Sequence, residues 1–160
     1  MNHIEKKYHA EYVDQLSDHI SAIMDKDLEA YETSHGIDVN FRRFSLVFKD
    51  ETENPIDVIN AFTAFAEIYV DDMWVHSKYR GQGFGRKLLQ ELEDHFKGKG
   101  FNNINLITNE FNAPEFYKKC GFTAEFTRIN TKNPKLSKTF FVKFFDDEVQ
   151  TQGINVSDNS

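Results

Sequence analysis

The chain has 160 residues, of which 39% are hydrophobic and 28% charged, and its net charge is −7. This length and balance predict one globular domain with its own core and exclude a disordered chain. An acidic chain lacks the basic face that holds a phosphate backbone, so we expect no nucleic-acid partner. The sequence has no apolar run long enough to cross a membrane and no signal peptide pattern, so we expect a cytoplasmic protein. Its single cysteine, Cys120, excludes an intramolecular disulfide and a cysteine-based metal cluster.

The first half of the chain is predicted from the spacing of its apolar residues. Apolar positions three and four apart predict an amphipathic helix, or a pair of helices, over residues 9–33. β-Branched and aromatic residues predict strands at 41–49, 56–65 and 68–75. Apolar residues then recur every four positions from Phe84, which predicts a helix with one buried face.

The second half of the chain is predicted to complete a sheet. We expect a short strand at 104–107, a short helix over Asn112–Cys120 with Asn112 as its N-cap, and a hairpin of strands 122–129 and 139–145. The fold class is therefore α/β (α+β): a mixed, largely antiparallel central sheet flanked by helices. Residues 1–149 are expected to form this domain, and residues 150–160 a polar tail.

A glycine-rich turn, Arg80-Gly81-Gln82-Gly83-Phe84-Gly85, lies between a predicted strand and a predicted helix. Unpaired N–H groups at a helix start and glycines that permit close approach favour a phosphate group, and Arg80 and Arg86 can add charge-assisted hydrogen bonds. A dinucleotide fingerprint would need glycine at position 86, and a P-loop would need Gly-Lys followed by Ser or Thr. The remaining pattern is Arg-x-x-Gly-x-Gly, and a solvated turn without a ligand stays open as the alternative.

Two segments, Met73–Gly85 and Asn112–Phe122, follow each other with a predicted strand between them, and the second contains the pattern Phe-Tyr-x-Lys-x-Gly-Phe. Together they resemble the GCN5-related N-acetyltransferase (GNAT) family: the first is similar to its central strand and acyl-CoA loop, and the second to its downstream asparagine and Phe-Tyr-x-Lys-x-Gly-Phe segment. The resemblance implies a GNAT-like fold and acetyl-CoA as the acyl donor. It implies that backbone amides from Gln82 to Arg86 wrap the pyrophosphate, that main-chain groups of Met73 and Val75 hold the pantetheine arm along a bulged strand, and that Asn112 lies near the pantetheine or acyl group. The implied cofactor-binding residues are Met73, Val75, Arg80, Gly81, Gln82, Gly83, Phe84, Gly85, Arg86 and Asn112.

The resemblance also places Tyr117 at the position of the family's usual general acid. A tyrosine has an ordinary pKa of about 10, close to that of an alkyl thiol, so proton transfer between them is nearly balanced. The alternative is that Tyr117 only packs its ring on a short helix. Asp71 and Asp72 are the candidates for general base or amine anchor, but a bulge would change which of them faces the cleft. Glu110 or a chain of water molecules remains open as the base.

The predicted function is acyl-CoA-dependent N-acylation, with acetyl transferred directly to a primary amine of a small molecule. The acidic composition favours a cationic acceptor, while a protein N-terminus or lysine is an alternative. A second alternative is a regulatory module that binds acyl-CoA without turnover. A homodimer is left open, with the strand around Phe140 and Phe144 as a contact edge, and Trp74 is expected in the core. No metal site is expected, because the histidines lack ligand spacing.

Overall fold

The computed structural model describes residues 7–146, and the chain divides into two compact units between Val39 and Asn40. The predicted polar tail, 150–160, lies outside the described residues.

The first unit contains one helix, α1, over Asp18–Ser34. Its N-cap is Ser17, whose side chain accepts a hydrogen bond from the backbone N–H of Ile20 at 3.3 Å. The prediction of a helix is confirmed, but the predicted start at residue 9 is wrong. The helix starts at Asp18 because Ser17 caps the free N–H group of Ile20, and the residues before Ser17 are not helical.

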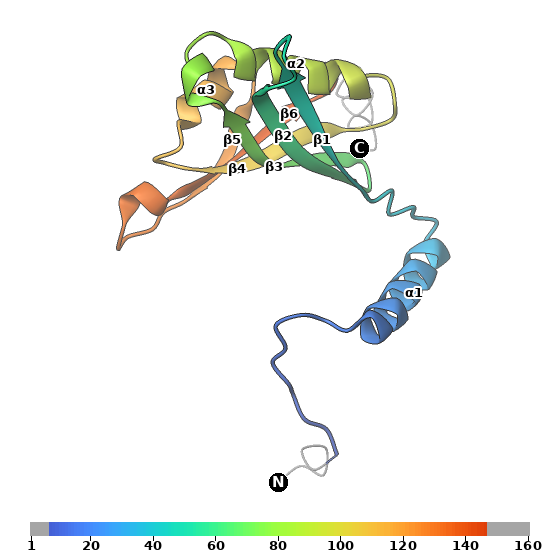
Figure 1. The fold of residues 1–160 in the computed structure, drawn as a ribbon. Coiled ribbons are helices and arrows are strands. Elements are labelled where there is room, and N and C mark those ends of the chain that lie inside the picture. The colour runs from blue at the N-terminus through green and yellow to red at the C-terminus, as the bar shows by residue number, and fades with distance from the viewer. Residues whose placement is uncertain (1–6, 147–160) are drawn as a thin grey trace, which may run out of the picture. The chain divides into compact units, whose positions relative to one another are not determined.

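The second unit is a six-stranded sheet with two α-helices on one of its faces (Figure 1). Strands β3 and β4 are parallel, and the other neighbours pair antiparallel, in the order β1-β2-β3-β4-β6-β5. The largely antiparallel mixed sheet is therefore confirmed. The elements are β1 (Arg42–Lys49), β2 (Pro55–Ala64), β3 (Glu67–Val75), α2 (Phe84–Phe96), β4 (Asn103–Asn109), α3 (Pro114–Lys119), β5 (Thr123–Arg128) and β6 (Lys138–Phe144).

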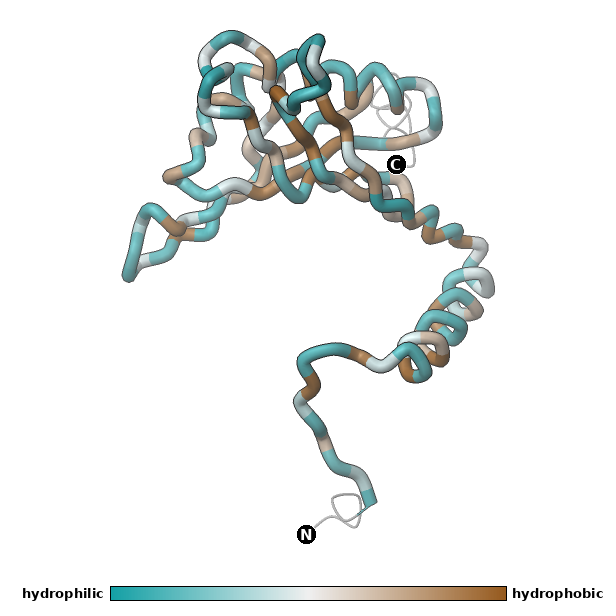
Figure 2. The backbone as a smooth tube through the Cα atoms, viewed as in Figure 1, coloured by the Kyte–Doolittle hydropathy of each residue, from teal (hydrophilic) through white to brown (hydrophobic). Residues whose placement is uncertain are grey.

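The core lies between the sheet and α2. Leu88, Leu89 and Leu92 recur at the spacing of one helical face and are buried against the strands. Their partners include the fully buried Ile59 and Ile68. In Figure 2 the hydrophobic stretches run along the central strands, as expected for a sheet that supplies most of the core. Burying each such side chain contributes about 1.5–3 kcal/mol relative to leaving it exposed.

The other face of the sheet carries the alternate residues of each strand. Phe62 pairs with Tyr69 across β2 and β3, and their rings stack with centroids 4.9 Å apart. Among the described residues of this unit, no helix covers that face, and its aromatic side chains are only partly buried. This open face contains a cavity of about 580 Å³.

Three local predictions were wrong. Strand β6 lies between β4 and β5, so the strand of Phe140 and Phe144 is not a free edge for a dimer. Trp74 is 41% exposed, because the alternation of β3 turns it away from α2. The N-cap of α3 is Ala113, in a left-handed conformation with φ of 52°, and not Asn112.

Candidate functional site

Strand β3 leaves its neighbour β4 in the middle of the sheet. The two strands pair only from Glu67 with Asn103 to Val70 with Leu106. Beyond this point β3 pairs with β2 alone, and β4 continues to pair with β6 alone. A slot therefore opens beside the second half of β3, whose β4-facing backbone groups have no strand partner there.

A β-bulge at Asp71 marks the same position. Asn60 pairs with Asp72 and Ala61 with Val70, so Asp71 is the extra residue on β3. The alternation restarts after the bulge, and Asp72 therefore shares the open face with Tyr69 and Trp74. A regular strand would have placed Asp72 with Val70, so the bulge brings both aspartates to the open face.

The glycine turn follows β3 and starts α2. Gly81 and Gly83 have φ of 75° and 87°, in the left-handed region that favours glycine. Gly83 is the N-cap of α2 and offers no side chain to the first N–H groups of the helix. These N–H groups and the positive end of the helix dipole are left for an anion, which fits the pyrophosphate of an acyl-CoA.

Gly85 sets the contact between the helix and the strand. A β-carbon at this position would lie 2.6 Å from Cε of Met73 and 3.1 Å from Cζ of Phe116. The start of α2 therefore packs directly on β3 and α3, and a side chain would push these elements apart. This close approach connects the predicted loop residues to the predicted strand residues.

The arginines that flank the turn differ in their surroundings. Arg80 donates from Nε to the carbonyl oxygen of Val75 at 3.1 Å, so its side chain ties the loop to β3. Gln82 donates from Nε2 to the carbonyl oxygen of Lys78 at 3.2 Å. Arg86 lines a cavity of about 240 Å³ with Cys120 and Lys143, on the side of α2 that faces α3.

Tyr117 lies on α3 and is 9% exposed. Its ring packs against Phe116, Phe122 and Phe141, with centroids 5.2, 6.1 and 5.8 Å away. Burial raises the pKa of the Tyr117 hydroxyl, so it stays protonated at neutral pH. Packing and proton donation are thus compatible at this residue.

Asn112 and Cys120 flank the same helix. The carbonyl oxygen of Asn112 accepts a hydrogen bond from Thr108 at 3.1 Å, which holds this segment against the end of β4. Burial raises the pKa of the Cys120 thiol, although Arg86 and Lys143 act in the opposite direction. A raised pKa disfavours the thiolate, so Cys120 is unsuited to be a nucleophile.

The two aspartates of β3 differ in their contacts. Asp71 accepts a hydrogen bond from Arg43 at 2.6 Å, in an ion pair that is partly exposed. Asp72 is exposed and forms no ion pair with any residue in the range 7–146. Asp72 is therefore the aspartate whose carboxylate is available to an incoming group.

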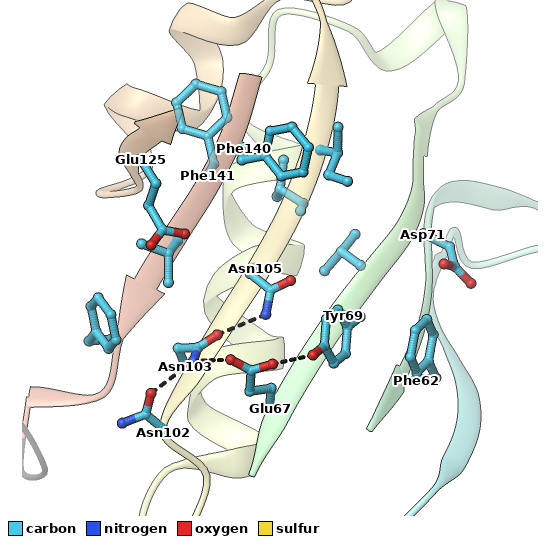
Figure 3. A pocket seen from close by; sticks show the side chains of 15 residues that line it. Phe62, Glu67, Tyr69, Asp71, Asn102, Asn103, Asn105, Glu125, Phe140 and Phe141 are labelled. Atoms are coloured by element: carbon cyan, nitrogen blue, oxygen red, sulfur yellow. Dashed lines mark hydrogen bonds between the residues drawn. The ribbon is translucent and has the colours of Figure 1, made fainter. Parts of the chain in front are cut away.

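A cavity of about 580 Å³ lies on the open face of the sheet (Figure 3). This volume is typical of a small-molecule site. It adjoins the slot, because Val70, Asp71 and Leu106 are among the residues that line it. The lining residues are Phe62, Glu67, Tyr69, Val70, Asp71, Asn102, Asn103, Asn105, Leu106, Ile107, Glu125, Phe140, Phe141, Val142 and Phe144.

A polar network crosses the floor of this cavity (Figure 3). The hydroxyl of Tyr69 donates to Glu67, and Asn103 donates from Nδ2 to the other carboxylate oxygen of Glu67 at 3.0 Å. Asn105 in turn donates to Asn103 at 2.8 Å. The hydrogen bond to Glu67, with a smaller effect of burial, raises the pKa of Tyr69 to about 12. Our sequence reasoning did not single out Glu67 and Tyr69 as a pair, although residues two apart on a strand share a face.

Asp57 is a second residue that sequence reasoning missed. It is fully buried on β2, between Phe48 and Val75 of the adjacent strands. Within the described ranges neither of its carboxyl oxygens has a hydrogen-bond partner. Burial raises its pKa to about 6. The sequence did contain a signal for this residue, because Asp57 is an acidic residue within a largely apolar predicted strand.

Residues 7–146 include no group of three or more His, Cys, Asp or Glu placed to hold a metal ion. Nor does any helix among these residues have the length and apolar content to span a membrane.

Comparison with known proteins supports the fold. An acetyltransferase from Bacillus cereus has a similar structure, with a TM-score of 0.68 and 26% identity over 84% of this chain and 97% of that one. The thialysine N-epsilon-acetyltransferase of Bos taurus is 34% identical over 34% of this chain, and the glucosamine 6-phosphate N-acetyltransferase of Arabidopsis thaliana is 32% identical over 45%. These matches span 33% and 43% of the two relatives' own lengths.

The fold is that of an acetyltransferase. The model of the acetyltransferase (GNAT) family matches residues 7–122, and the chain belongs to this family. Members of the family use acetyl-CoA.

Proposed function

We propose that the protein is an N-acetyltransferase that transfers the acetyl group of acetyl-CoA directly to a primary amine of a small molecule. The observation that carries this proposal is the slot beside β3. Val70 and Leu106, where the two strands part, line the cavity on the open face, and the chain continues from β3 to the glycine turn at the start of α2. A donor held on the turn and an acceptor held in the cavity would meet there.

The donor side uses groups that the fold leaves unpaired. The pyrophosphate would accept hydrogen bonds from the backbone N–H groups of Gln82, Gly83, Phe84, Gly85 and Arg86, with Gly81 allowing the turn. Arg80 keeps further N–H groups beyond the one that holds Val75, and these and Arg86 would add positive charge. Main-chain groups of Met73 and Val75 would bind the pantetheine arm as an added strand, with Asn112 beside it. Bound there, acetyl-CoA supplies the acetyl group.

The acid of the reaction is assigned to Tyr117. Its hydroxyl is protonated at neutral pH, and α3 lies against the start of α2, where Gly85 approaches Phe116. Tyr117 would give its proton to the sulfur as the carbon–sulfur bond breaks. The apolar rings around it disfavour the phenolate, so the hydroxyl keeps its proton until the sulfur can accept it.

The base is assigned to Asp72. An amine that attacks must first lose the proton of its ammonium form. Asp72 faces the open side of the slot without an ion-pair partner in the described part of the chain, whereas Asp71 is engaged by Arg43. Asp72 would accept the proton directly or through one water molecule.

The proposal is tested with purified protein, acetyl-CoA and a panel of primary amines. We expect acetyl-CoA to bind and free CoA to be released only when an amine is present, with the acetylated amine detected by mass spectrometry. Binding of acetyl-CoA without product from any amine would instead favour a regulatory module. Lysine-containing peptides in the same panel distinguish a protein acceptor from a small one.

A further inference from the structure

Two separate bulges turn carboxylates into the cavity of the open face. Asp71 is the extra residue of β3, and Glu125 is the extra residue of β5, where Ala124 pairs with Phe141 and Phe126 with Phe140. Both side chains line the cavity. A bulge re-aims a side chain at the expense of ladder hydrogen bonds, and here it brings two carboxylates to one cavity. Asp71 is paired with Arg43, whereas Glu125 forms no ion pair with any residue in the range 7–146.

A third carboxylate is held in a fixed position in this cavity. Glu67 receives hydrogen bonds from Tyr69 and Asn103, one at each oxygen (Figure 3). Both donors are neutral, so they orient the carboxylate and leave its charge uncompensated. No lysine, arginine or histidine is among the residues that line the cavity in the described structure. Arg43 offsets the charge of Asp71, but Glu67 and Glu125 form no ion pair with any residue in the range 7–146. The negative charge that remains in the cavity is therefore complementary to a cation.

The spacing of these groups sets the shape of a ligand. Glu67 and Asp71 are four residues apart on β3, which corresponds to about 13 Å along a strand. The stacked rings of Phe62 and Tyr69 lie on this face between them, and Ile107 and Phe140 also line the cavity. These apolar side chains thus form a wall between Asp71, which lies near the slot, and Glu67, which lies farther from it.

We propose that the acceptor is an elongated diamine, whose second ammonium group binds Glu67 while its first reacts beside Asp71 and Asp72. This inference rests on the proposed function and specifies its substrate class. Aliphatic carbons between the two nitrogens pack on the aromatic wall, and Glu125 adds attraction for the remote cation. Glu67 is a specificity residue here, because it contacts the remote end of the substrate.

The test compares diaminohexane with hexylamine, which differ in one terminal ammonium group. We expect kcat/KM to be about tenfold higher for diaminohexane, the effect of one charge-assisted contact. Glu67→Gln should lower kcat/KM for diaminohexane about tenfold more than for hexylamine. Glu51→Gln, in the exposed β1–β2 turn, is the matched control and should leave the ratio unchanged. Equal rates for the two amines, or an equal loss for both in Glu67→Gln, would overturn the inference.

Calorimetric titration of diaminohexane without acetyl-CoA separates this inference from the proposed function. Saturable binding that Glu67→Gln weakens about tenfold supports the site even if neither amine is acetylated, in which case the proposed function fails alone. Absence of binding to the unmodified protein overturns the site. Should Glu67→Gln fail to fold, Tyr69→Phe replaces it, since this change frees the Glu67 carboxylate from one donor; an unchanged preference for diaminohexane would then count against the site.

Discussion

The terminal methyl group of Met73 lies 2.6 Å from the position that a β-carbon on Gly85 would occupy. This relationship means that the first turn of α2 rests on β3 through a residue without a side chain. Gly85, in the first turn of α2, and Met73, on the strand beside the slot, therefore belong to one packed unit. The position of the loop N–H groups depends on this contact.

Gly85→Ala is expected to weaken acetyl-CoA binding about tenfold, because overpacking of this kind typically costs about 1–3 kcal/mol. Met73 is a flexible side chain, but Phe116 at 3.1 Å blocks the other direction. The dissociation constant can be measured by calorimetry. Met73→Ala in the same chain removes the closest atom and should restore part of the affinity. Gln90→Ala on the exposed side of α2 is the control; a similar loss in that variant would contradict a packing effect.

Tyr117→Phe is expected to lower kcat about a hundredfold, within the range for loss of a general acid. The affinity for acetyl-CoA should change less than twofold, since the ring and its packing remain. Burial raises the pKa of Tyr117 above the ordinary tyrosine pKa of about 10. The activity of the unmodified protein should therefore not fall through ionisation of this phenol at pH values up to about 10. Steady-state rates across alkaline pH check both points. An unchanged kcat in a variant with a normal thermal unfolding transition would leave Tyr117 with a packing role only.

Much of this arrangement could be predicted from local signals. The period of Leu88 and Leu92 identified α2, and the glycines identified the turn before it. The family resemblance implied a bulge on the strand that is β3 but not its position, and the bulge of β5 was not predicted, because a bulge depends on cross-strand register and not on the residue types of one strand. For this reason the sequence left Asp71 and Asp72 undecided and gave no role to Glu125.

The helix boundaries show a second limit. Asn112 fits the pattern of an N-cap, but Ala113 takes a left-handed conformation and begins α3 one residue later. The competing constraint is Thr108, whose hydroxyl binds the carbonyl oxygen of Asn112 and fixes the segment against β4. A tertiary hydrogen bond has here overridden a local preference, and only a structure reveals it.

Asp57 is expected to make the stability of the protein fall as pH rises. Its pKa is about 6 in the folded protein, against an ordinary value of 3.8, so the folded state keeps a proton that the unfolded chain loses. The unfolded state then binds fewer protons between these two values, and the free energy of unfolding decreases with pH across this window and levels off above it. A shift of two units corresponds to about 3 kcal/mol in total. About half of this loss falls above pH 5.

Asp57→Asn removes this dependence, because an amide stays neutral. We compare the free energies of unfolding of the variant and the unmodified protein, measured with urea at about pH 5 and about pH 8. The variant's value minus that of the unmodified protein should increase by about 1.4 kcal/mol from the lower to the higher pH. Any constant cost of the buried amide cancels in this difference. Asp50→Asn is the control: Asp50 accepts a hydrogen bond from Thr52 that lowers its pKa, so its titration lies below this range. If the difference in the free energy of unfolding between Asp57→Asn and the unmodified protein is the same at both pH values, Asp57 is not a buried, protonated carboxyl.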